Sequence, residues 1–213
     1  MTKYETGDVV YFVADIYIAD IKYLKTAFGE NQTNGREFIN DCLTANNGIV
    51  GINGDNCWNN PCLLIRNGVY YSLYSSSSAD ELVMYTDGSM ETISGADFDF
   101  EEIKAKAPYQ VWGFGPMLLD ENGQPMTQFN STVAGKKNPH TAIGYYEPGH
   151  YCFVVVDGRR AETYSAGMTM AELSQLMYDL KCKAAFNLDG GDTSQMAFMD
   201  GFYNIPSGNR KAD

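Results

Sequence analysis

The strongest constraint on the fold is a long run near the start of the chain, residues 9–21, that is rich in Val, Ile, Tyr and Phe. Within this run, Tyr11 and Val13 alternate with Phe12 and Ala14. Successive side chains of an extended chain point to opposite faces, so the two sets would lie on the two faces of a sheet. The run therefore predicts a long β-strand.

Turn dipeptides in the middle of the chain predict hairpins. Asn67-Gly68 and Asp87-Gly88 each separate two short apolar runs, which is the signature of a two-residue hairpin loop. Asn122-Gly123 predicts a further turn after the apolar run 111–119. Together with 21 glycines and many Tyr, Val and Ile residues, these signals indicate a strand-rich domain.

Three segments have helical signals. Thr169 and Glu172 form a capping box ahead of an amphipathic run that ends near residue 180. Asn34 and Glu37 have the same spacing ahead of a second amphipathic run, so Asn34 is the expected cap of that helix. A third, short helix is expected at about residues 101–107, where the following proline ends it.

Composition fits one packed domain. The chain has 213 residues, of which 44% are hydrophobic and 20% charged, so a full core can be buried. We therefore expect an α+β fold, with a mixed, strand-rich central sheet and a few packed helices, as a single domain over residues 1–213.

Charge narrows the range of partners. The chain carries 15 basic and 27 acidic residues, a formal net charge of -12, so its surface repels phosphate backbones and we expect no nucleic-acid partner. A local cationic pocket for one small anion is still compatible with this charge. No apolar run approaches the roughly 18 residues of a membrane-spanning helix, and the start lacks a signal-peptide core. We expect a soluble chain, either complete or a domain of a longer protein.

Five cysteines are too few for a disulfide scaffold in a chain of this size. Cys57 and Cys62 flank a turn and could pair or remain free thiols. Cys152 and Cys182 lie in apolar surroundings, which predicts core thiols. With only two histidines, the sequence shows no zinc-type cluster.

The loop 187–194 is a candidate site because it places two glycines and two carboxylates directly after an apolar strand. Paired glycines let a ligand approach the backbone, and successive N–H groups in such a turn can form an anion-binding nest. The alternative is an ordinary capped turn. A similar loop, 53–55, follows the second predicted helix and a short apolar strand, so two similar units would place carboxylates at strand ends.

Two further loops carry candidate polar groups. Arg159 follows a buried apolar strand and could bind a phosphate in a fork or pair with Asp157 or Asp189. The alternative is a hairpin turn with a surface arginine. His140 could donate to an anion or act as a base, although a lone histidine ahead of a strand is more often structural.

Seven short motifs occur in order along the chain. They are Ile52-Asn53-Gly54-Asp55, Ile65-Arg66-Asn67-Gly68, Phe114-Gly115-Pro116, Asn138-Pro139-x-Thr141-Ala142-Ile143-Gly144, Val156-Asp157-Gly158-Arg159, Ser165-x-Gly167-Met168-Thr169 and Asn187-Leu188-Asp189-Gly190-Gly191. Together they resemble the phosphodiester glycosidase family, closest to its bacterial branch, over about residues 9–210.

The resemblance implies a mixed α/β sheet domain that hydrolyses a small-molecule or glycan sugar-1-phosphodiester, such as a GlcNAc-1-phosphodiester, at the sugar C1–oxygen bond. It also implies an extracellular or envelope location and one cleft that gathers the functional residues. The implied catalytic residues are, in order of preference, Asp189, Asp157 and Asp55. The implied substrate-binding residues are Asn53, Arg66, Asn138, His140, Thr141, Arg159, Gly190, Gly191 and Ser194.

Two positions depart from the family pattern. His140 stands where Arg is expected, and the run that is Gly-Gly-Gly-Ser-Ser in the family pattern reads Gly190-Gly191-Asp192-Thr193-Ser194 here. A histidine supplies less positive charge at neutral pH and no bidentate fork, and Asp192 adds a negative charge where an anion should bind. Both departures predict weaker phosphate affinity, and a non-catalytic module that binds envelope glycans or phosphosugars is the alternative function.

A phosphate monoester is a good leaving group because its last pKa is about 6, so a general acid matters less here than in other glycosidases. We expect Arg66, Arg159 or backbone N–H groups to stabilise the departing charge, and one carboxylate to direct water or stabilise an oxocarbenium-like centre. No cofactor is predicted to be required. Asp55, Asp157, Asp189 and Asp192 could together hold a divalent cation, which leaves a metal-dependent phosphoesterase as a third function.

Overall fold

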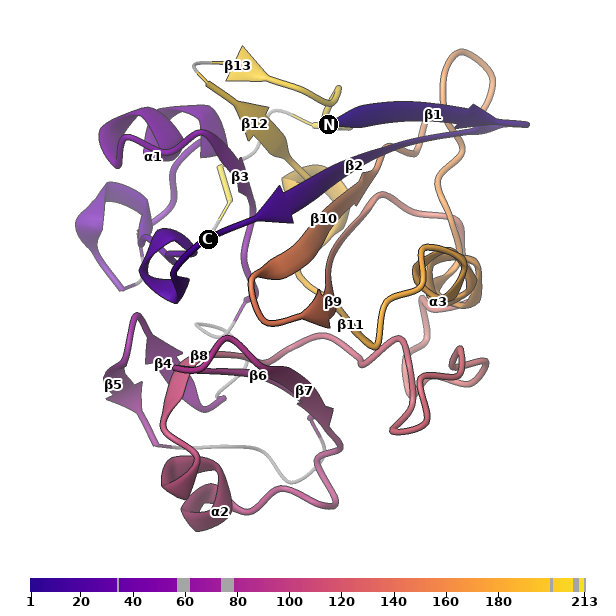
Figure 1. Ribbon diagram of the computed structural model, residues 1–213. Coiled ribbons are helices and arrows are strands. Elements are labelled where there is room, and N and C mark those ends of the chain that lie inside the picture. Colours follow the sequence, from indigo (N-terminus) through magenta and orange to yellow (C-terminus); the bar gives the residue numbers. More distant parts are fainter. Residues whose placement is uncertain (34, 57–61, 74–78, 200, 209–210, 213) are drawn as a thin grey trace.

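The computed structural model describes residues 1–33, 35–56, 62–73, 79–199, 201–208 and 211–212. In these ranges the strands form three sheets, and every strand pair is antiparallel (Figure 1). The predicted strand-rich α+β domain is confirmed, with antiparallel sheets where a mixed central sheet was expected. Short hairpins join several neighbouring strands, and a hairpin can only pair its strands antiparallel.

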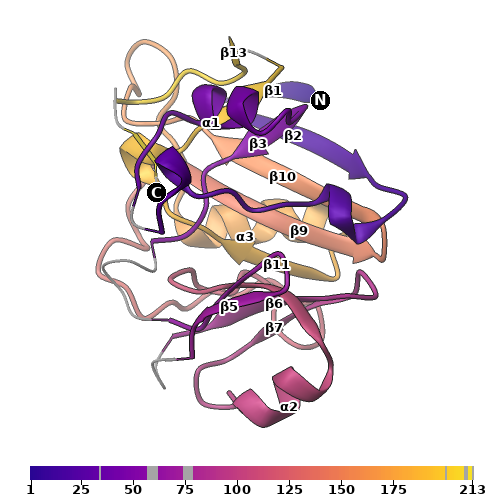
Figure 2. The ribbon, with the colours of Figure 1, turned by 90° about the vertical axis from the view of Figure 1, so that its left-hand side faces the viewer.

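Two of the sheets have five strands each, and the one with the longer strands is called the largest sheet here. It runs β1 (Thr2–Thr6), β2 (Val9–Tyr17), β10 (His150–Val156), β9 (His140–Glu147) and β11 (Ala184–Asn187). Both faces of its central strands are covered, so Val154 and Val155 on opposite faces of β10 are each fully buried, whereas the edge strand β1 is exposed. Helix α3 (Met170–Asp179) packs on the Val154 face through Leu173 and Met177. The other face meets the two smaller sheets (Figure 2).

The smallest sheet runs β13 (Gly201–Phe202), β12 (Met196–Phe198) and β3 (Val50–Ile52), and helix α1 (Ile39–Ala45) packs against it. Ile39 and Leu43 of α1 form a small core with Ala197 and Ala212. Ala212, at the end of the described chain, therefore packs beside this helix.

The third sheet runs β5 (Val69–Ser72), β4 (Leu64–Arg66), β8 (Pro108–Trp112), β6 (Glu81–Tyr85) and β7 (Met90–Ile93). Helix α2 (Phe100–Ala105) covers its outer face through Ile103, at the bottom of Figures 1 and 2. The inner face packs on the largest sheet through residues such as Leu82 and Trp112. The described part of the chain also contains three single-turn 3-10 helices: η1 (Ile21–Tyr23), η2 (Gly29–Asn31) and η3 (Gly191–Thr193).

Most local predictions are confirmed. The hairpins at Asn67-Gly68 and Asp87-Gly88 form, and α3 begins with the predicted capping box. Helix α2 begins at Phe100, with Asp99 as its cap. The predicted strand 9–21 is too long, because β2 ends at Tyr17 and the Asp20 side chain caps a 3-10 turn.

The predicted cap of the first helix is wrong. Helix α1 begins at Ile39, and Phe38 occupies its N-cap position without a side-chain hydrogen bond. Asn34 itself lies outside the described residues. Glu37 does not complete a capping box; its carboxylate accepts a hydrogen bond from the Glu30 N–H, and its backbone bridges to Ala212. These long-range contacts, which a local pattern cannot show, fix where the helix starts.

Cys152 and Cys182 are buried free thiols, as predicted, and their Sγ atoms lie 3.6 Å apart. Cys62 is disulfide-bonded, so the free-thiol alternative is wrong for this residue, and Cys57 lies outside the described residues. In the described ranges, no helix combines the length and apolar character needed to cross a membrane.

Candidate functional site

The two Asn/Asp/Gly loops meet in space although they follow strands of different sheets. The Asp189 N–H donates to the Gly54 carbonyl at 3.1 Å. Asn53, which is 1% exposed, donates from Nδ2 to the Asp189 carbonyl at 2.8 Å. Its Oδ1 accepts from the Thr141 hydroxyl at 2.6 Å and from the Gln195 N–H at 3.1 Å. Asn53 and Thr141 therefore fix the backbone from which Asp189 projects.

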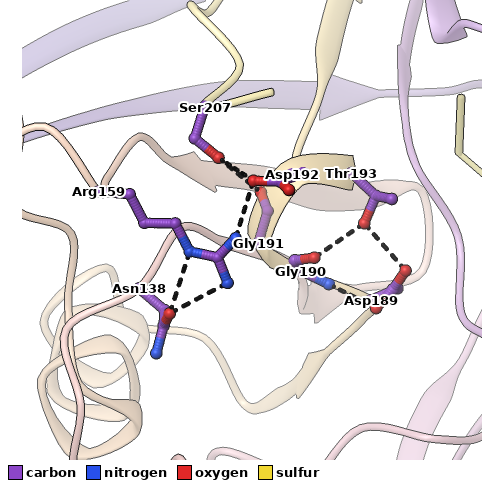
Figure 3. A network of polar contacts seen from close by, with 8 residues as sticks. All are labelled: Asn138, Arg159, Asp189, Gly190, Gly191, Asp192, Thr193 and Ser207. Atoms are coloured by element: carbon purple, nitrogen blue, oxygen red, sulfur yellow. Dashed lines mark hydrogen bonds and ion pairs between the residues drawn. The ribbon is translucent and has the colours of Figure 1, made fainter. Parts of the chain in front are cut away.

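The Asp189 carboxylate lies at the start of the glycine turn and is only partly buried. Its Oδ1 accepts from the Gly190 N–H at 2.9 Å, and its Oδ2 accepts from the Thr193 hydroxyl at 2.9 Å (Figure 3). The Gly191 N–H donates to the Pro139 carbonyl at 3.1 Å. The two glycine N–H groups are thus used within the protein, so the predicted nest at Gly190 and Gly191 does not present them to an anion.

Arg159 reaches the glycine turn from the end of β10. Its Nη1 lies 2.8 Å from Asp192 Oδ1, and its Nε and Nη2 donate to Asn138 Oδ1 at 3.4 and 3.3 Å (Figure 3). Arg159 has a φ of 60°, a left-handed conformation that costs energy for a residue with a side chain. Gly191 also has a positive φ, and a Cβ there would lie 2.9 Å from Arg159 Nη2. The 157–159 and 187–194 turns therefore converge, as predicted.

Asp157 has a different environment from Asp189, because it is 1% exposed. It accepts hydrogen bonds from Asn204 Nδ2 at 2.7 Å, the Ile205 N–H at 3.0 Å and the Tyr164 hydroxyl at 3.1 Å. Burial raises the pKa of the Asp157 carboxyl, although the three donors oppose this shift. Its contacts hold segment 204–205 in place, so its observed surroundings are those of a positioning residue.

His140 is 7% exposed and lies under the same turn. Its Nε2 is 2.9 Å from the Met168 carbonyl oxygen, to which an Nε2–H donates. Burial lowers the pKa of His140, and the nearby Arg159 cation acts in the same direction. The imidazole is therefore neutral at pH 7 and supplies no positive charge where the family pattern has Arg.

Asp55 and Arg66 form a buried ion pair, 7% and 3% exposed, with Nη2 and Oδ1 2.7 Å apart. Arg66 also donates to the Val111 carbonyl, and the Gly113 N–H donates to Asp55 Oδ2 at 3.0 Å. Loss of either partner would leave the other charge buried and unpaired, which would strongly destabilise the fold. The pair ties the loop after β3 to β4 and β8, which brings the third sheet up to the site.

Ser194 closes the glycine turn and is 1% exposed. Its hydroxyl has no hydrogen-bond partner among the residues that the structure describes. A Cβ added to Gly190 would lie 3.7 Å from this oxygen and 3.0 Å from the Pro139 carbonyl oxygen, so the hydroxyl lies in a closely packed place beside Gly190.

The structure thus joins Asn53 and Thr141 to Asp189, and Asn138 to Arg159, whereas Asp55 pairs with Arg66 and Asp157 binds Asn204. Asn204, Gln195 and Ser207 also hold these loops, although they belong to none of the motifs found in the sequence. Ser207 donates to Asp192 Oδ1 at 2.9 Å. Over the described residues, no three His, Cys, Asp or Glu side chains are grouped so that they could hold a metal ion.

Comparisons with known proteins identify the relatives of this chain. The family model described as phosphodiester glycosidase matches residues 40–213. The SPbeta prophage-derived protein YomE of Bacillus subtilis is 30% identical over 190 residues, which cover 84% of this chain and 29% of that protein. The chain therefore spans less than a third of that relative.

Solved structures share the fold. The catalytic domain of zebrafish N-acetylglucosamine-1-phosphodiester alpha-N-acetylglucosaminidase, auto-inhibited by its pro-peptide, matches with a TM-score of 0.72 and 17% identity, over 97% of this chain and 75% of that one. A hypothetical protein from Synechocystis matches at 0.55 and 12%, over 95% and 55% of the two chains. A Burkholderia pseudomallei protein that is described as a "putative exported protein" matches at 0.54 and 14%, over 96% and 72%.

Proposed function

Because the chain belongs to the phosphodiester glycosidase family, we propose that it hydrolyses a sugar-1-phosphodiester. The bond broken joins the sugar C1 to oxygen, and the products are a free sugar and a phosphomonoester. A GlcNAc-1-phosphodiester is the model substrate, because the zebrafish enzyme of the same fold is named for that linkage.

The observation that carries the proposal is the contrast between the carboxylates at the converging turns. Asp189 is partly exposed, whereas Asp55 and Asp157 are 7% and 1% exposed. Only an accessible carboxylate can meet a substrate. Asp192 is also partly exposed, but its Oδ1 is paired with Arg159, so Asp189 is the proposed catalytic group. Arg159, on the other side of the glycine turn, is the accessible cation, with 47% of its side chain exposed (Figure 3).

Asp189 and Arg159 have different roles in the proposed reaction. Asp189 directs a water molecule at the anomeric carbon or stabilises its developing positive charge. Arg159 stabilises the negative charge of the departing phosphate.

The test is the variant Asp189→Asn, assayed for release of phosphomonoester from a GlcNAc-1-phosphodiester. We expect at least a hundredfold loss of turnover with a melting temperature within a few degrees of the wild type, because general acid–base groups typically contribute about 10²–10⁴-fold. Asp97→Asn, an exposed carboxylate on the loop before α2, is the matched control and should retain full turnover. Unchanged turnover in Asp189→Asn would refute the proposed role.

A second measurement identifies the bond. Hydrolysis in oxygen-18 water should place the label in the sugar, because the proposed cleavage leaves the bridging oxygen on phosphate. Label in the phosphate would instead show a phosphoesterase and would overturn the proposed reaction.

The second candidate function is a non-catalytic module that binds envelope glycans or phosphosugars. The neutral His140 and the Asp192 carboxylate at Arg159 favour it, since both lower the positive charge offered to phosphate. This candidate predicts ligand binding without any product at high protein concentration. For either function we propose an extracellular or envelope location, with which the likeness to the Burkholderia protein described as a "putative exported protein" is compatible.

A further inference from the structure

The guanidinium of Arg159 is held by acceptors of the protein itself. Nη1 is 2.8 Å from the Asp192 carboxylate, and the other two nitrogens donate to Asn138 Oδ1. The ion pair is near the surface, with 47% of the Arg159 side chain and 32% of the Asp192 side chain exposed. An anion from solution would have to approach the same guanidinium edge that Asp192 occupies.

We propose that Asp192 is a specificity-determining residue, whose carboxylate takes the place at Arg159 that a substrate phosphate would occupy. The inference rests on the proposed function, which assigns the phosphate to Arg159. Asp192 then acts as a built-in competitor, and a phosphate binds only when it displaces this carboxylate or tolerates its charge. The expected consequence is a wild-type protein with weak affinity for phosphate.

The packing around Asp192 shows that this carboxylate is held in position. Ser207 donates to the same Oδ1 atom that faces Arg159, at 2.9 Å. A Cβ added to Gly208 would lie 2.9 Å from both Cβ and Cγ of Asp192, so the chain at 207–208 packs closely against the side chain. The side chain of Asp192 is therefore blocked on that side by the protein backbone.

The backbone on the Arg159 side of the ion pair has left-handed conformations and close contacts. Gly191 has a φ of 72° and Arg159 a φ of 60°, both in the left-handed region. A Cβ at residue 191 would lie 2.9 Å from Nη2 and 3.3 Å from Cζ of Arg159. The Arg159 guanidinium packs against the backbone of Gly191, which has no side chain to separate them, and its Nη1 is directed toward Asp192 (Figure 3).

Asp192→Asn tests the proposal because the amide keeps an acceptor oxygen for Arg159 and Ser207 but removes the charge. With inorganic phosphate as the probe, titrated by calorimetry at pH 7.5, we expect this variant to bind about tenfold more tightly than the wild type. That factor corresponds to about 1.4 kcal/mol, a modest Coulomb term for a screened, half-exposed charge. Asp192→Gly, which restores the residue of the family pattern, should show the same direction of change.

Two controls make the test specific. Glu91→Gln removes a carboxylate from the Glu91–Lys106 pair, which is similarly exposed but lies on β7, and should leave phosphate affinity unchanged. In the double variant Asp192→Asn with Arg159→Gln, the gain should disappear. If both single variants at 192 bind phosphate no better than the wild type, or if the gain survives without Arg159, the proposal fails. The titration needs no turnover, so its result is separate from that of Asp189→Asn.

Discussion

Removal of the Asn53 side chain is the most direct test of how the site is held together. This amide joins three elements, because it contacts the Asp189 carbonyl, the Thr141 hydroxyl and the Gln195 N–H. In Asn53→Ala, all three groups lose a partner in a place where the parent side chain is 1% exposed. The change should therefore act on the fold and on the position of Asp189 together.

The magnitude follows from these contacts. Each buried polar group left without a partner costs about 1–3 kcal/mol, but the Thr141 hydroxyl can rotate to another acceptor and water can enter the space. We expect Asn53→Ala to lower the free energy of unfolding by about 3 kcal/mol. Thr141→Val removes one of the same hydrogen bonds and should cost about 1 kcal/mol, and the two changes should be less than additive because they share that bond.

Urea unfolding of the wild type, both single variants and the double variant measures these values. Asn53→Asp supplies a sharper control, because its new oxygen would face the Asp189 and Gly54 carbonyls that Nδ2 now serves. A protonated carboxyl can donate to such a carbonyl, so this variant should regain stability on acidification relative to the wild type. A loss below about 1 kcal/mol in Asn53→Ala, or no pH-dependent recovery in Asn53→Asp, would refute the role of this amide.

Two further changes test other parts of the structure. Burial lowers the pKa of His140 below its ordinary 6.5, so the unfolded chain binds a proton at this residue more readily than the folded protein does. The stability that depends on the neutral imidazole is therefore fully present above pH 6.5. It is lost as the pH falls from 6.5 toward the pKa of the folded state. Urea unfolding between pH 5 and 7.5 should show a steeper loss for the wild type than for His140→Gln, and equal slopes would contradict this. In Gly144→Ala the new Cβ would lie 2.6 and 2.7 Å from Sγ of Cys182 and Cys152, so we expect a loss of about 1–3 kcal/mol, whereas Gly135→Ala, with open space around it, should cost far less.

The local parts of the fold could be predicted from the sequence because their causes are local. An Asn-Gly dipeptide supplies the backbone angles of a hairpin turn, and Thr169 with Glu172 caps α3 through contacts three residues apart. The start of α1 could not be predicted in this way. There Glu37 bridges to Ala212, and no pattern within one turn of helix contains that partner.

The candidate site was predictable as a set of residues but not as an arrangement. Asn53, Asp157 and Asp189 all stand in motifs after apolar strands, and nothing in those motifs separates them by role. Burial separates them in the structure, because Asn53 and Asp157 are each 1% exposed and Asp189 is partly exposed. Asn204 and Ser207 belong to no recognisable motif, so their contacts with Asp157 and Asp192 could be recognised only in the structure.

This difference in burial has a physical reason that bears on the whole site. The turns that carry Asp189 and Arg159 include residues with left-handed backbone angles, and such turns persist only when surrounding contacts stabilise them. Buried amides and carboxylates can supply these contacts, since each holds several backbone groups at once. A motif at this site therefore contains both the residues that position the turn and the residue exposed on it. Activity is expected to depend on both kinds, but only the loss of the exposed kind should leave the fold intact.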